Sequence, residues 1–425
     1  MNNKYQNGRP RRRPVEEIKK TDNERKRTGA VVRINSKALA KIRKEKEWEQ
    51  GIERVRHGVD RPMLAIIFVI LILGTVMVFS ASFPSAYNKY GNSMHYLMRQ
   101  MLFATGGSAL MILFSYIPYN LYKRLTPSLY ITSIALLVIV LIIGTSEGVA
   151  KRWIAFGGFT FQPSELGKVA VIMMLAWYFD KYYDRLNSRS NLKVTVWDGI
   201  VIPGAIMAFI CGLVLLEKHL SGTIIIALIA VCVIFLGGAH IGWAIGVYGA
   251  AGVAAIGAYL ALNPYALQRI LTHADEDADA LAEAWQTTQG IYAIGSGGLL
   301  GVGLGDSRLK YNYVSEPQND FIFTIWCEEM GFVGALIVIA LYAAFIWRGF
   351  VIAKKAPDTF TSLTAFGITC QVGIQAFLNM MVVTDIIPNT GISLPFFSYG
   401  GSSLIILLCE MGVLLSISRH SYQKK

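Results

Sequence analysis

Ten long apolar segments dominate this sequence and restrict what it can fold into. Hydrophobic residues make up 53% of the 425 residues, and the mean hydropathy is +0.44. A helix needs about 20 mainly apolar residues to cross the hydrocarbon core of a bilayer. The segments of about this length are 62–83, 96–117, 127–145, 165–182, 198–216, 221–238, 241–262, 320–347, 361–383 and 401–418. The sequence therefore predicts an all-α integral membrane protein with about ten transmembrane helices.

The first 61 residues form a basic tail. They contain 19 Lys or Arg and 9 Asp or Glu, a net +10 of the +12 carried by the whole chain. A Lys/Arg-rich segment before a first span favours a cytoplasmic N-terminus and contact with anionic lipid. Nucleic acid is not an expected partner, because no aromatic residues are interleaved to stack on bases. We predict a largely disordered cytoplasmic tail (1–61), a membrane domain (62–418) and a cytoplasmic C-terminal tail (419–425).

Ten spans also place the C-terminus in the cytoplasm, and most basic loops agree with this topology. The basic clusters on the predicted cytoplasmic side are Lys123-Arg124, Lys181 with Arg185, Arg348 with Lys354-Lys355, and Arg419 with Lys424-Lys425. One basic pair, Lys151-Arg152 followed by Trp153, falls on the predicted outer side against this bias. We interpret it as a binding element for an anionic ligand at the outer face of the membrane.

Cysteine and histidine give no sign of a metal site. The five cysteines all fall within predicted spans, where we expect them to pack as small apolar residues, and the six histidines are scattered. The sequence therefore predicts no metal cage and no disulfide framework.

Two outer connections carry charged residues beside turn formers. The loop 146–164 contains Gly and Pro and leads into Glu165 and Lys168, whose i,i+3 spacing predicts a structural ion pair on one helix face. The next outer turn runs from Glu217 to Thr223. It is either a polar turn that caps the following helix or a means of adding Lys218 to an outer cationic pocket, and both interpretations stay open.

The outer loop 263–319, between the seventh and eighth spans, is too long to be a simple connection. Its acidic run 275–279 lacks the glycine and closing glutamate of a calcium loop and fits the solvated face of a short helix, 273–289. Two glycine clusters follow, 295–298 and 301–305. Without a strand before them they do not indicate a dinucleotide site, but beside a membrane they allow a re-entrant backbone that lines a cavity.

Asp320 stands where this loop meets the eighth span, and an acid at a membrane border is by default a functional candidate. The structural alternative is that it caps the eighth helix, although Asn319 could do the same. Glu328 and Glu329 follow in the same helix and suggest a polar cavity. The last outer loop, 385–403, mixes turn formers with small polar residues and is expected to fold back into the bundle as a shaped lip.

These outer residues suit an anionic, lipid-linked substrate. One carboxylate, Asp320, could deprotonate an attacking hydroxyl. A diphosphate leaving group needs cations rather than a second acid. The candidate cations are Lys151, Arg152, Lys218, Arg308 and Lys310.

Five segments together resemble the SEDS family (shape, elongation, division and sporulation), which includes FtsW, RodA and SpoVE. They are Ala150–Ile154, Gln162–Glu165 with Lys168, Gln289–Gly298, Glu316–Phe323 with Glu328-Glu329, and Leu394–Ser403. The last segment leans toward the FtsW division branch. One departure is the turn at 217–223, where the family usually has Gln-Pro-Asp-x-Gly-Thr.

The resemblance implies a peptidoglycan glycosyltransferase that polymerises lipid II at the outer leaflet, beside a class B penicillin-binding protein and other division or elongation proteins. It places the family's essential acid on Asp320, its basic-aromatic motif on Arg152 and Trp153, and its Glu/Lys pair on Glu165 and Lys168. We expect Gln289, Ser296 and Ser398, in the matching segments, to contact substrate. A divalent cation, Mg²⁺ or Mn²⁺, could assist at the diphosphate.

Two other functions fit the same sequence. A flippase for the same lipid would need polar groups across the membrane depth, and Glu328 and Glu329 keep that alternative open. A non-catalytic scaffold of the division machinery predicts that neutralising Arg152 and Asp320 leaves growth intact. The clustering of charged groups at the outer border favours the glycosyltransferase.

Overall fold

The structure is a computed structural model that describes residues 52–53, 58–147, 150–156, 159–187, 196–262, 282–311, 313–314, 317–421 and 423–424. The chain divides into two compact units, Arg54–Tyr422 and a smaller unit of Met1–Glu53 with Gln423–Lys425. In the smaller unit, β1 (Ile52–Glu53) pairs antiparallel with β5 (Gln423–Lys424). The predicted disorder of the tail concerns residues that lie almost wholly outside this description.

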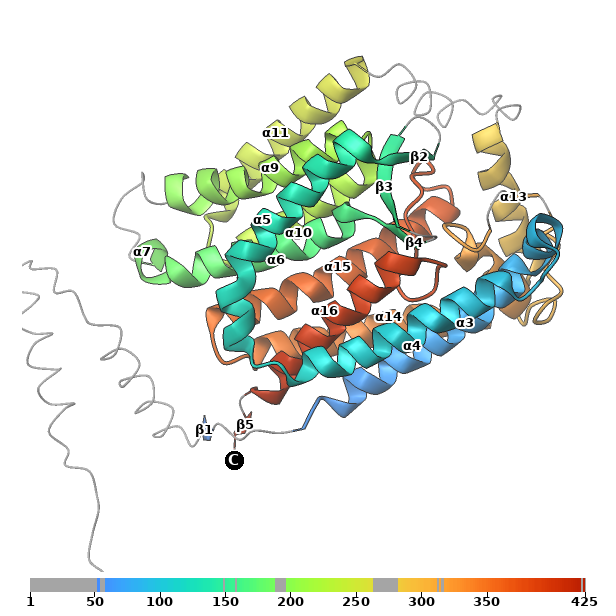
Figure 1. Ribbon diagram of the computed structural model, residues 1–425, viewed down its shortest axis with the longest axis horizontal. Coiled ribbons are helices and arrows are strands. Elements are labelled where there is room, and N and C mark those ends of the chain that lie inside the picture. The colour runs from blue at the N-terminus through green and yellow to red at the C-terminus, as the bar shows by residue number, and fades with distance from the viewer. Residues whose placement is uncertain are drawn as a thin grey trace, which may run out of the picture. The chain divides into compact units, whose positions relative to one another are not determined.

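The larger unit is a bundle of helices with one small sheet (Figure 1). The helices are α3 (Arg61–Tyr90), α4 (His95–Tyr116), α5 (Tyr119–Ile143), α6 (Pro163–Lys181), α7 (Tyr183–Asn187), the π-helix η1 (Trp197–Val201), α9 (Ile202–Leu216), α10 (Leu220–Leu236), α11 (Ile241–Leu262), α13 (Ala282–Ser296), α14 (Ile322–Lys354), α15 (Thr359–Val383) and α16 (Gly401–Arg419). The strands are β2 (Thr145–Glu147), β3 (Ala150–Phe156) and β4 (Phe159–Phe161).

Each of the ten predicted spans coincides with a helix of the larger unit. Among the described residues, eight helical segments are long and apolar enough to cross a membrane by length and composition. The two remaining segments are α10, which is apolar but 17 residues long, and α6, whose ends carry charged residues. Local hydropathy thus located the helices, while the number that spans the bilayer depends on how α6 and α10 sit within it.

Helices α6, α15 and α16 form the centre of the bundle. Helix α16 packs closely along α4, and a methyl group on Gly412 would come within 2.6 Å of both the Met111 carbonyl oxygen and Phe114 Cβ. Glycine at this position therefore sets how near the two helices approach. Helices α3 and α14 lie on one side of the centre, and α5, α9 and α10 lie on the other (Figure 1).

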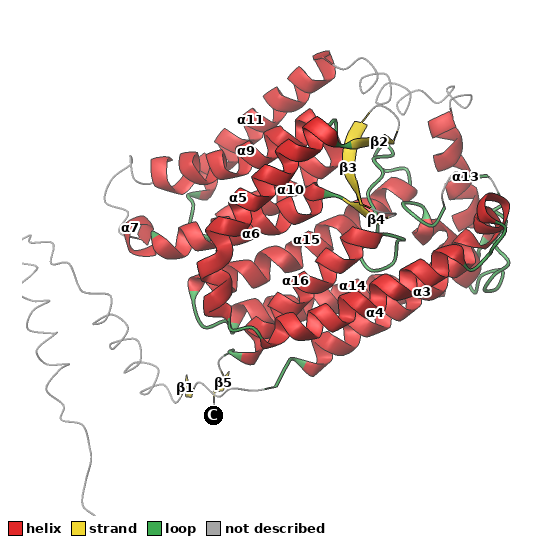
Figure 2. Cartoon of the chain, in the orientation of Figure 1, coloured by secondary structure: helices red, strands yellow, loops and turns green. Residues whose placement is uncertain are grey.

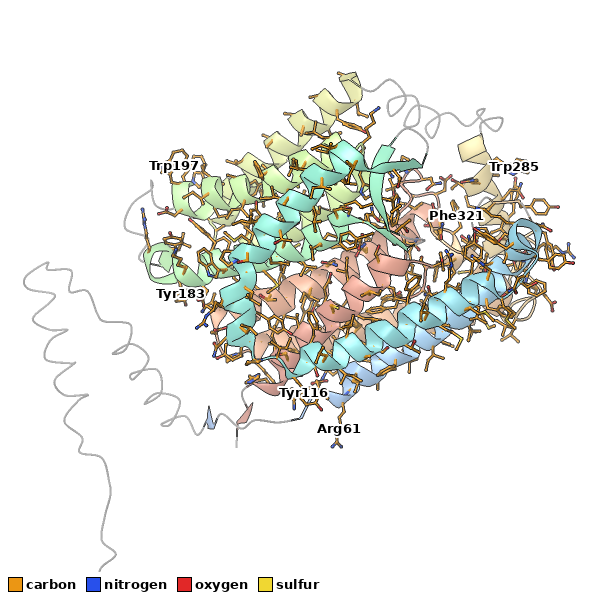
Figure 3. The ribbon with its side chains drawn as sticks, in the orientation of Figure 1. Arg61, Tyr116, Tyr183, Trp197, Trp285 and Phe321 are labelled. Carbon is orange, nitrogen blue, oxygen red and sulfur yellow. The ribbon has the colours of Figure 1, made fainter. Side chains whose placement is uncertain are left out.

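The bundle has two distinct ends. The three-stranded sheet β2–β3–β4 lies at one end, and α7 lies at the other; we call them the sheet end and the α7 end (Figure 2). The labelled side chains Trp285 and Phe321 lie at the sheet end, whereas Tyr183 and Trp197 lie at the α7 end (Figure 3). The sheet occupies the loop 146–164, which the sequence predicted to be shaped without indicating strands.

The α7 end is closed by capped helices and paired charges. Asp60 accepts a hydrogen bond from the Met63 N–H at the start of α3 and binds Arg348 through both carboxylate oxygens, with N···O distances of 2.7–3.0 Å. Asp358 forms a capping box with Thr361 at the start of α15. The Asp60–Arg348 contact ties the start of α3 to the last part of α14, and the capping box defines where α15 begins.

A break in α14 provides the place where the glycine segment 297–305 packs. At Gly331 the backbone leaves the helical region (φ 66°, ψ −166°), and the glycine segment 297–305 lies against the break. The Val302 and Gly303 N–H groups donate to the carbonyls of Glu328 and Glu329, and the Phe332 and Val333 N–H groups donate to Gly298 and Leu299. A side chain on Gly301 would overlap the Glu329 carbonyl. The glycine segment is therefore non-helical, as predicted, but it packs on α14.

Candidate functional site

A small polar cavity lies under the loop between α15 and α16. We call this loop, residues 384–400, the lip loop. The cavity is lined by Glu165 of α6, Gln375 of α15, Ser403 of α16 and the lip-loop residues Ser393–Phe396, Ser398 and Tyr399. A hydrogen bond from the Gln162 N–H to Ser402 Oγ (3.3 Å) holds the start of α6 beside the start of α16. The cavity therefore sits where α6, α15 and α16 meet.

Asp320 borders the lip loop. A methyl group on Gly391 would lie 3.9 Å from Asp320 Oδ2, so the carboxylate faces this part of the loop. The backbone carbonyl of Asp320 accepts a 2.8 Å hydrogen bond from Asn379 Nδ2. Helix α14 begins at Ile322, its N-cap position is Phe321, and no side chain caps it. The cap role considered for Asp320 and Asn319 is therefore wrong, because the helix starts one residue too late for Asp320 to occupy that position.

The Glu/Lys pair of α6 forms the ion pair that its spacing predicts. Lys168 Nζ lies 2.8 Å from Glu165 Oε2, and the two side chains are 4% and 16% exposed. Because Glu165 also lines the cavity, the pair places a buried positive charge next to it. A buried pair of this kind orients α6 within the bundle and sets the local electrostatic field.

Arg152 of β3 holds the turn between α9 and α10. Its Nη2 donates a 2.6 Å hydrogen bond to the carbonyl of Lys218, whose backbone has a positive φ of 57°. A positive φ is unfavourable for a lysine, so the surrounding contacts must maintain it. The Lys218 side chain is exposed at the sheet end. The two cations thus belong to one unit in which Arg152 fixes the turn that carries Lys218.

The same turn buries the carboxyl group of Glu217 and one ring nitrogen of His219. Glu217 is 1% exposed. Within the part of the chain that the structure describes, neither oxygen of Glu217 nor Nδ1 of His219 has a hydrogen-bond partner. Burial raises the pKa of Glu217 to about 8, against the opposing effect of Arg152. Burial, with the charges of Arg152 and Lys168, lowers the pKa of His219 to about 3. Both groups are therefore held neutral at pH 7.

Glu328 and Glu329 are both buried, and each binds the segment that precedes α14. Glu328 accepts hydrogen bonds from Ser307 Oγ (2.5 Å) and the Arg308 N–H (2.9 Å). Glu329 accepts from Ser80 Oγ of α3 (2.6 and 2.8 Å) and pairs with Lys310 Nζ at 3.2 Å. Lys310 is 3% exposed. We had expected Lys310 among the substrate cations, but its charge is neutralised inside the protein by Glu329.

The other predicted site residues lie at the sheet end with differing surroundings. Arg308 is exposed there. Ser398 is buried, and its hydroxyl accepts a 2.7 Å hydrogen bond from the Leu394 N–H, which shapes the lip loop. Gln289 and Ser296 belong to α13, which packs on the start of α14. The Ser296 hydroxyl donates to the Ala293 carbonyl. Trp153 and Lys151 lie in β3, where the side chain of Lys151 is outside the described part.

Polar residues of α15 that the sequence analysis missed connect these features. Gln371, Gln375 and Asn379 follow one another at four-residue intervals, so they lie on one helix face. Gln371 donates to both oxygens of Glu410 in α16 (3.0 and 2.8 Å), Gln375 lines the cavity, and Asn379 binds the Asp320 carbonyl. This spacing of amides inside an apolar span was the available signal.

The donor set does not by itself favour a resident metal. Among the described residues there is no group of three or more His, Cys, Asp or Glu side chains that could hold a metal ion.

These features define a multi-pass membrane protein with an acid, a buried ion pair and exposed cations at one end of its bundle. The chain belongs to the FtsW/RodA/SpoVE family, described as cell cycle protein, whose model matches residues 61–423.

Relatives within this family cover almost all of the membrane domain. The chain is 37% identical to the stage V sporulation protein E of Bacillus subtilis, over 85% of this chain and 97% of that protein. It is also 37% identical to the probable peptidoglycan glycosyltransferase FtsW of Thioalkalivibrio, over 87% of this chain and 92% of that protein.

Two solved structures have the same fold. One, reported as the structural coordination of polymerization and crosslinking by a peptidoglycan synthase complex, matches with a TM-score of 0.69 and 27% identity, over 85% of this chain and 98% of that chain. The rod shape determining protein RodA of Thermus thermophilus matches with a TM-score of 0.63 and 27% identity, over 86% and 98%.

Proposed function

We propose that this chain is a peptidoglycan glycosyltransferase that polymerises lipid II into glycan strands at the outer face of the cytoplasmic membrane. Relatives that share over a third of its sequence carry the name peptidoglycan glycosyltransferase. The observation that carries the proposal is the placement of Asp320, an acid at a membrane border whose carboxylate faces Gly391 of the lip loop, the loop that also lines the small cavity. A carboxylate at a membrane border costs free energy, and a catalytic role is the best explanation for its presence there.

In this proposal Asp320 is the general base. Its carboxylate takes the proton from the 4-hydroxyl of the acceptor GlcNAc while that oxygen attacks C1 of the donor MurNAc. The bond from C1 to the diphosphate oxygen breaks, and undecaprenyl diphosphate leaves with the electron pair. Attack from the opposite face converts the α-linked donor into a β-1,4 linkage. Since a diphosphate is already a good leaving group, one carboxylate is sufficient.

The cations that stabilise the leaving diphosphate are Lys218, Arg152 and Arg308. Lys218 and Arg308 are exposed at the sheet end, and Arg152 is half-buried and holds the Lys218 turn. Positive charge at the phosphate oxygens stabilises the transition state more than the ground state because negative charge develops there. Lys310 is left out of this set because Glu329 neutralises it. Mg²⁺ or Mn²⁺ at the diphosphate stays a prediction, and no step above depends on it.

The proposed topology places the sheet end outside and both termini in the cytoplasm. It follows from the basic N-terminal tail and from the Lys/Arg-rich connections at the α7 end. We propose a class B penicillin-binding protein as partner, because a structural neighbour comes from a complex that couples polymerization and crosslinking. The chain's relatives bear both division and sporulation names, so we assign it to cell division or shape maintenance in general.

The test is polymerisation of purified lipid II by the full-length protein together with its cognate transpeptidase. Asp320→Ala and Asp320→Asn are compared with the wild type, and thermal unfolding in detergent verifies that the variants are folded. Loss of the general base is expected to lower the rate roughly 10²–10⁴-fold. Wild-type rates in folded Asp320→Ala would overturn the assignment.

A flippase for the same lipid is the second candidate. The residues that suggested it, Glu328 and Glu329, are bound within the protein, but Glu410 lies midway along α16 and introduces an acid at depth. Both oxygens of Glu410 accept from Gln371, which fits a structural role. Translocation of labelled lipid in proteoliposomes, with no polymer formed, would favour the flippase. Intact growth after neutralising Arg152 and Asp320 would favour a scaffold instead.

A further inference from the structure

We infer that Asn379 is a positioning residue that sets the carboxylate of Asp320 against the lip loop; this inference rests on the proposed function. Asn379 lies one turn before the end of α15 and is fully buried. Its amide nitrogen donates to two backbone carbonyls, Asp320 O at 2.8 Å and Ile392 O at 2.7 Å. A primary amide has two N–H donors, so both are used.

The two carbonyls belong to segments that must keep a fixed spacing. One is that of Asp320 itself, and the other is in the lip loop at Ile392, next to the glycine that faces the Asp320 carboxylate. The Asn379 side chain thus connects the backbone of Asp320, the proposed base, with the part of the lip loop that the Asp320 carboxylate faces. Because the amide is carried by a long helix, the link is anchored to the bundle and does not depend on either loop.

A second contact shows that the two segments are held as a unit. The Tyr399 N–H donates a 2.9 Å hydrogen bond to the Gln318 carbonyl, two residues before Asp320. This backbone contact does not involve Asn379. Removing the Asn379 amide should therefore leave the two segments associated, while the carbonyls of Asp320 and Ile392 become free to shift. The geometry of the site can then change without unfolding.

Gly391 adds a constraint on the opposite wall. Its φ of +67° lies in the region that favours glycine, and the space next to its Cα is bounded by Asp320 Oδ2. The Ile392 carbonyl that Asn379 holds is one residue away. A shift of this carbonyl would therefore move the Gly391 backbone relative to the carboxylate, and small displacements of a catalytic group reduce rates strongly.

A purely structural amide would make the same two hydrogen bonds, so the experiment must separate stability from catalysis. Asn379→Leu keeps the side-chain size and removes both donors. The matched control is Thr369→Val in the same helix, because Thr369 is equally buried but its hydroxyl donates only within α15, to Ala365 O at 2.7 Å. Both variants are assayed as full-length protein with the partner transpeptidase, using fluorescent lipid II, for kcat and KM per folded molecule.

The expected result is a fall in kcat of roughly tenfold to 100-fold for Asn379→Leu with KM changed less than about threefold, since displacement of a catalytic group has effects of this size. Thr369→Val keeps the wild-type kcat. A decrease in kcat per folded molecule that is equal in the two variants, or absent in both, would overturn the inference.

A double-mutant cycle measures the coupling between Asn379 and Asp320 in kcat, and a purely structural role of Asn379 would produce no such coupling. Asp320→Glu keeps a carboxylate but displaces it by one methylene. If Asn379 acts through the placement of Asp320, the losses of kcat in Asn379→Leu and Asp320→Glu do not multiply in the double variant, because residues that act as a unit are non-additive. Fully multiplicative losses would overturn the inference.

The role of Asp320 as base and the role of Asn379 as positioning residue are overturned by different results. If folded Asp320→Ala polymerises lipid II at the wild-type rate, the proposed base is wrong and the positioning role falls with it. If Asp320→Ala is inactive while Asn379→Leu keeps its kcat, the proposed base survives and only the role of Asn379 is overturned.

Discussion

The two ends of the bundle differ in how their acidic side chains are partnered. At the α7 end, acids meet bases or cap helices: Asp60 binds Arg348, Lys123 pairs with Asp180, and Asp198 lies 2.8 Å from Arg185. At the sheet end, the carboxyl group of Glu217 and the Nδ1 atom of His219 are buried without a hydrogen-bond partner in the described part, and Lys218 and Arg308 are exposed. The three acids named at the α7 end each lie against a base, whereas at the sheet end Glu165 and Glu329 are paired but the buried Glu217 is not. The difference indicates where stability and where chemistry should be sensitive to mutation.

The largest expected contrast is between an acid at each end. Asp320→Ala should reduce lipid II polymerisation by orders of magnitude, roughly 10²–10⁴-fold, and leave the melting temperature nearly unchanged. Asp358→Ala removes a capping box and should cost about 0.5–2 kcal/mol of stability while the rate per folded molecule stays at the wild-type value. Rates and thermal unfolding are measured on the same preparations. A large loss of rate in Asp358→Ala would break the comparison.

The next effect concerns stability at the α7 end. Arg348→Gln leaves Asp60 half-paired in a site where the two side chains are 25% and 12% exposed. Losing the bidentate contact should lower the free energy of unfolding by about 1–3 kcal/mol. Thermal unfolding in detergent measures it, and Lys355→Gln, at an exposed position near the end of α14, is the control. An unchanged melting temperature in Arg348→Gln would show that this end is not held by its ion pairs.

A smaller effect separates charge from backbone conformation at the sheet end. Lys218→Gly removes a cation but suits the positive φ of 57° better than lysine does. We expect KM for lipid II to rise about tenfold, which corresponds to about 1.4 kcal/mol, while the melting temperature stays the same or increases. Lys218→Asn, which also tolerates positive φ, should behave alike. An unchanged KM in both variants would remove Lys218 from the substrate cations.

The last effect is a pH dependence set by Glu217. Its pKa of about 8 in the folded protein exceeds its ordinary value of 4.5, so between these values the folded state binds more protons than the unfolded state. Stability should therefore fall as the pH rises from about 4.5 to about 8. Glu217→Gln should flatten this part of the melting curve against pH, whereas Asp306→Asn, at an exposed position, should not. An equal slope in wild type and Glu217→Gln would contradict the buried, neutral carboxyl.

Hydropathy located the helices because the signal for each span lies within the span itself. The sheet was not predicted, since β2 and β4 are three residues long and form only where β3 provides their partners. The break at Gly331 depends on a glycine segment about 30 residues earlier in the chain, so no local pattern in α14 announces it. Contacts of this kind join segments that are far apart in the sequence, so local composition and hydrophobic periodicity do not predict them.

Motifs predicted a set of candidate site residues, but they did not predict the contacts that these residues make. Lys310 looked like Lys218 in sequence, yet one is buried against Glu329 and the other is exposed. The decisive difference is the position of a carboxylate on another segment. The amides of α15 recur every four residues within an apolar span, and this pattern in the sequence is enough to predict Asn379 as a candidate site residue.

The interlock between α14 and the glycine segment has a consequence for biogenesis. The segment is synthesised before the helix, and its Val302 and Gly303 N–H groups bond only to carbonyls of α14. These hydrogen bonds can therefore form only after α14 has been synthesised, and until then the two N–H groups need water as their partner, because unpaired amides do not enter hydrocarbon.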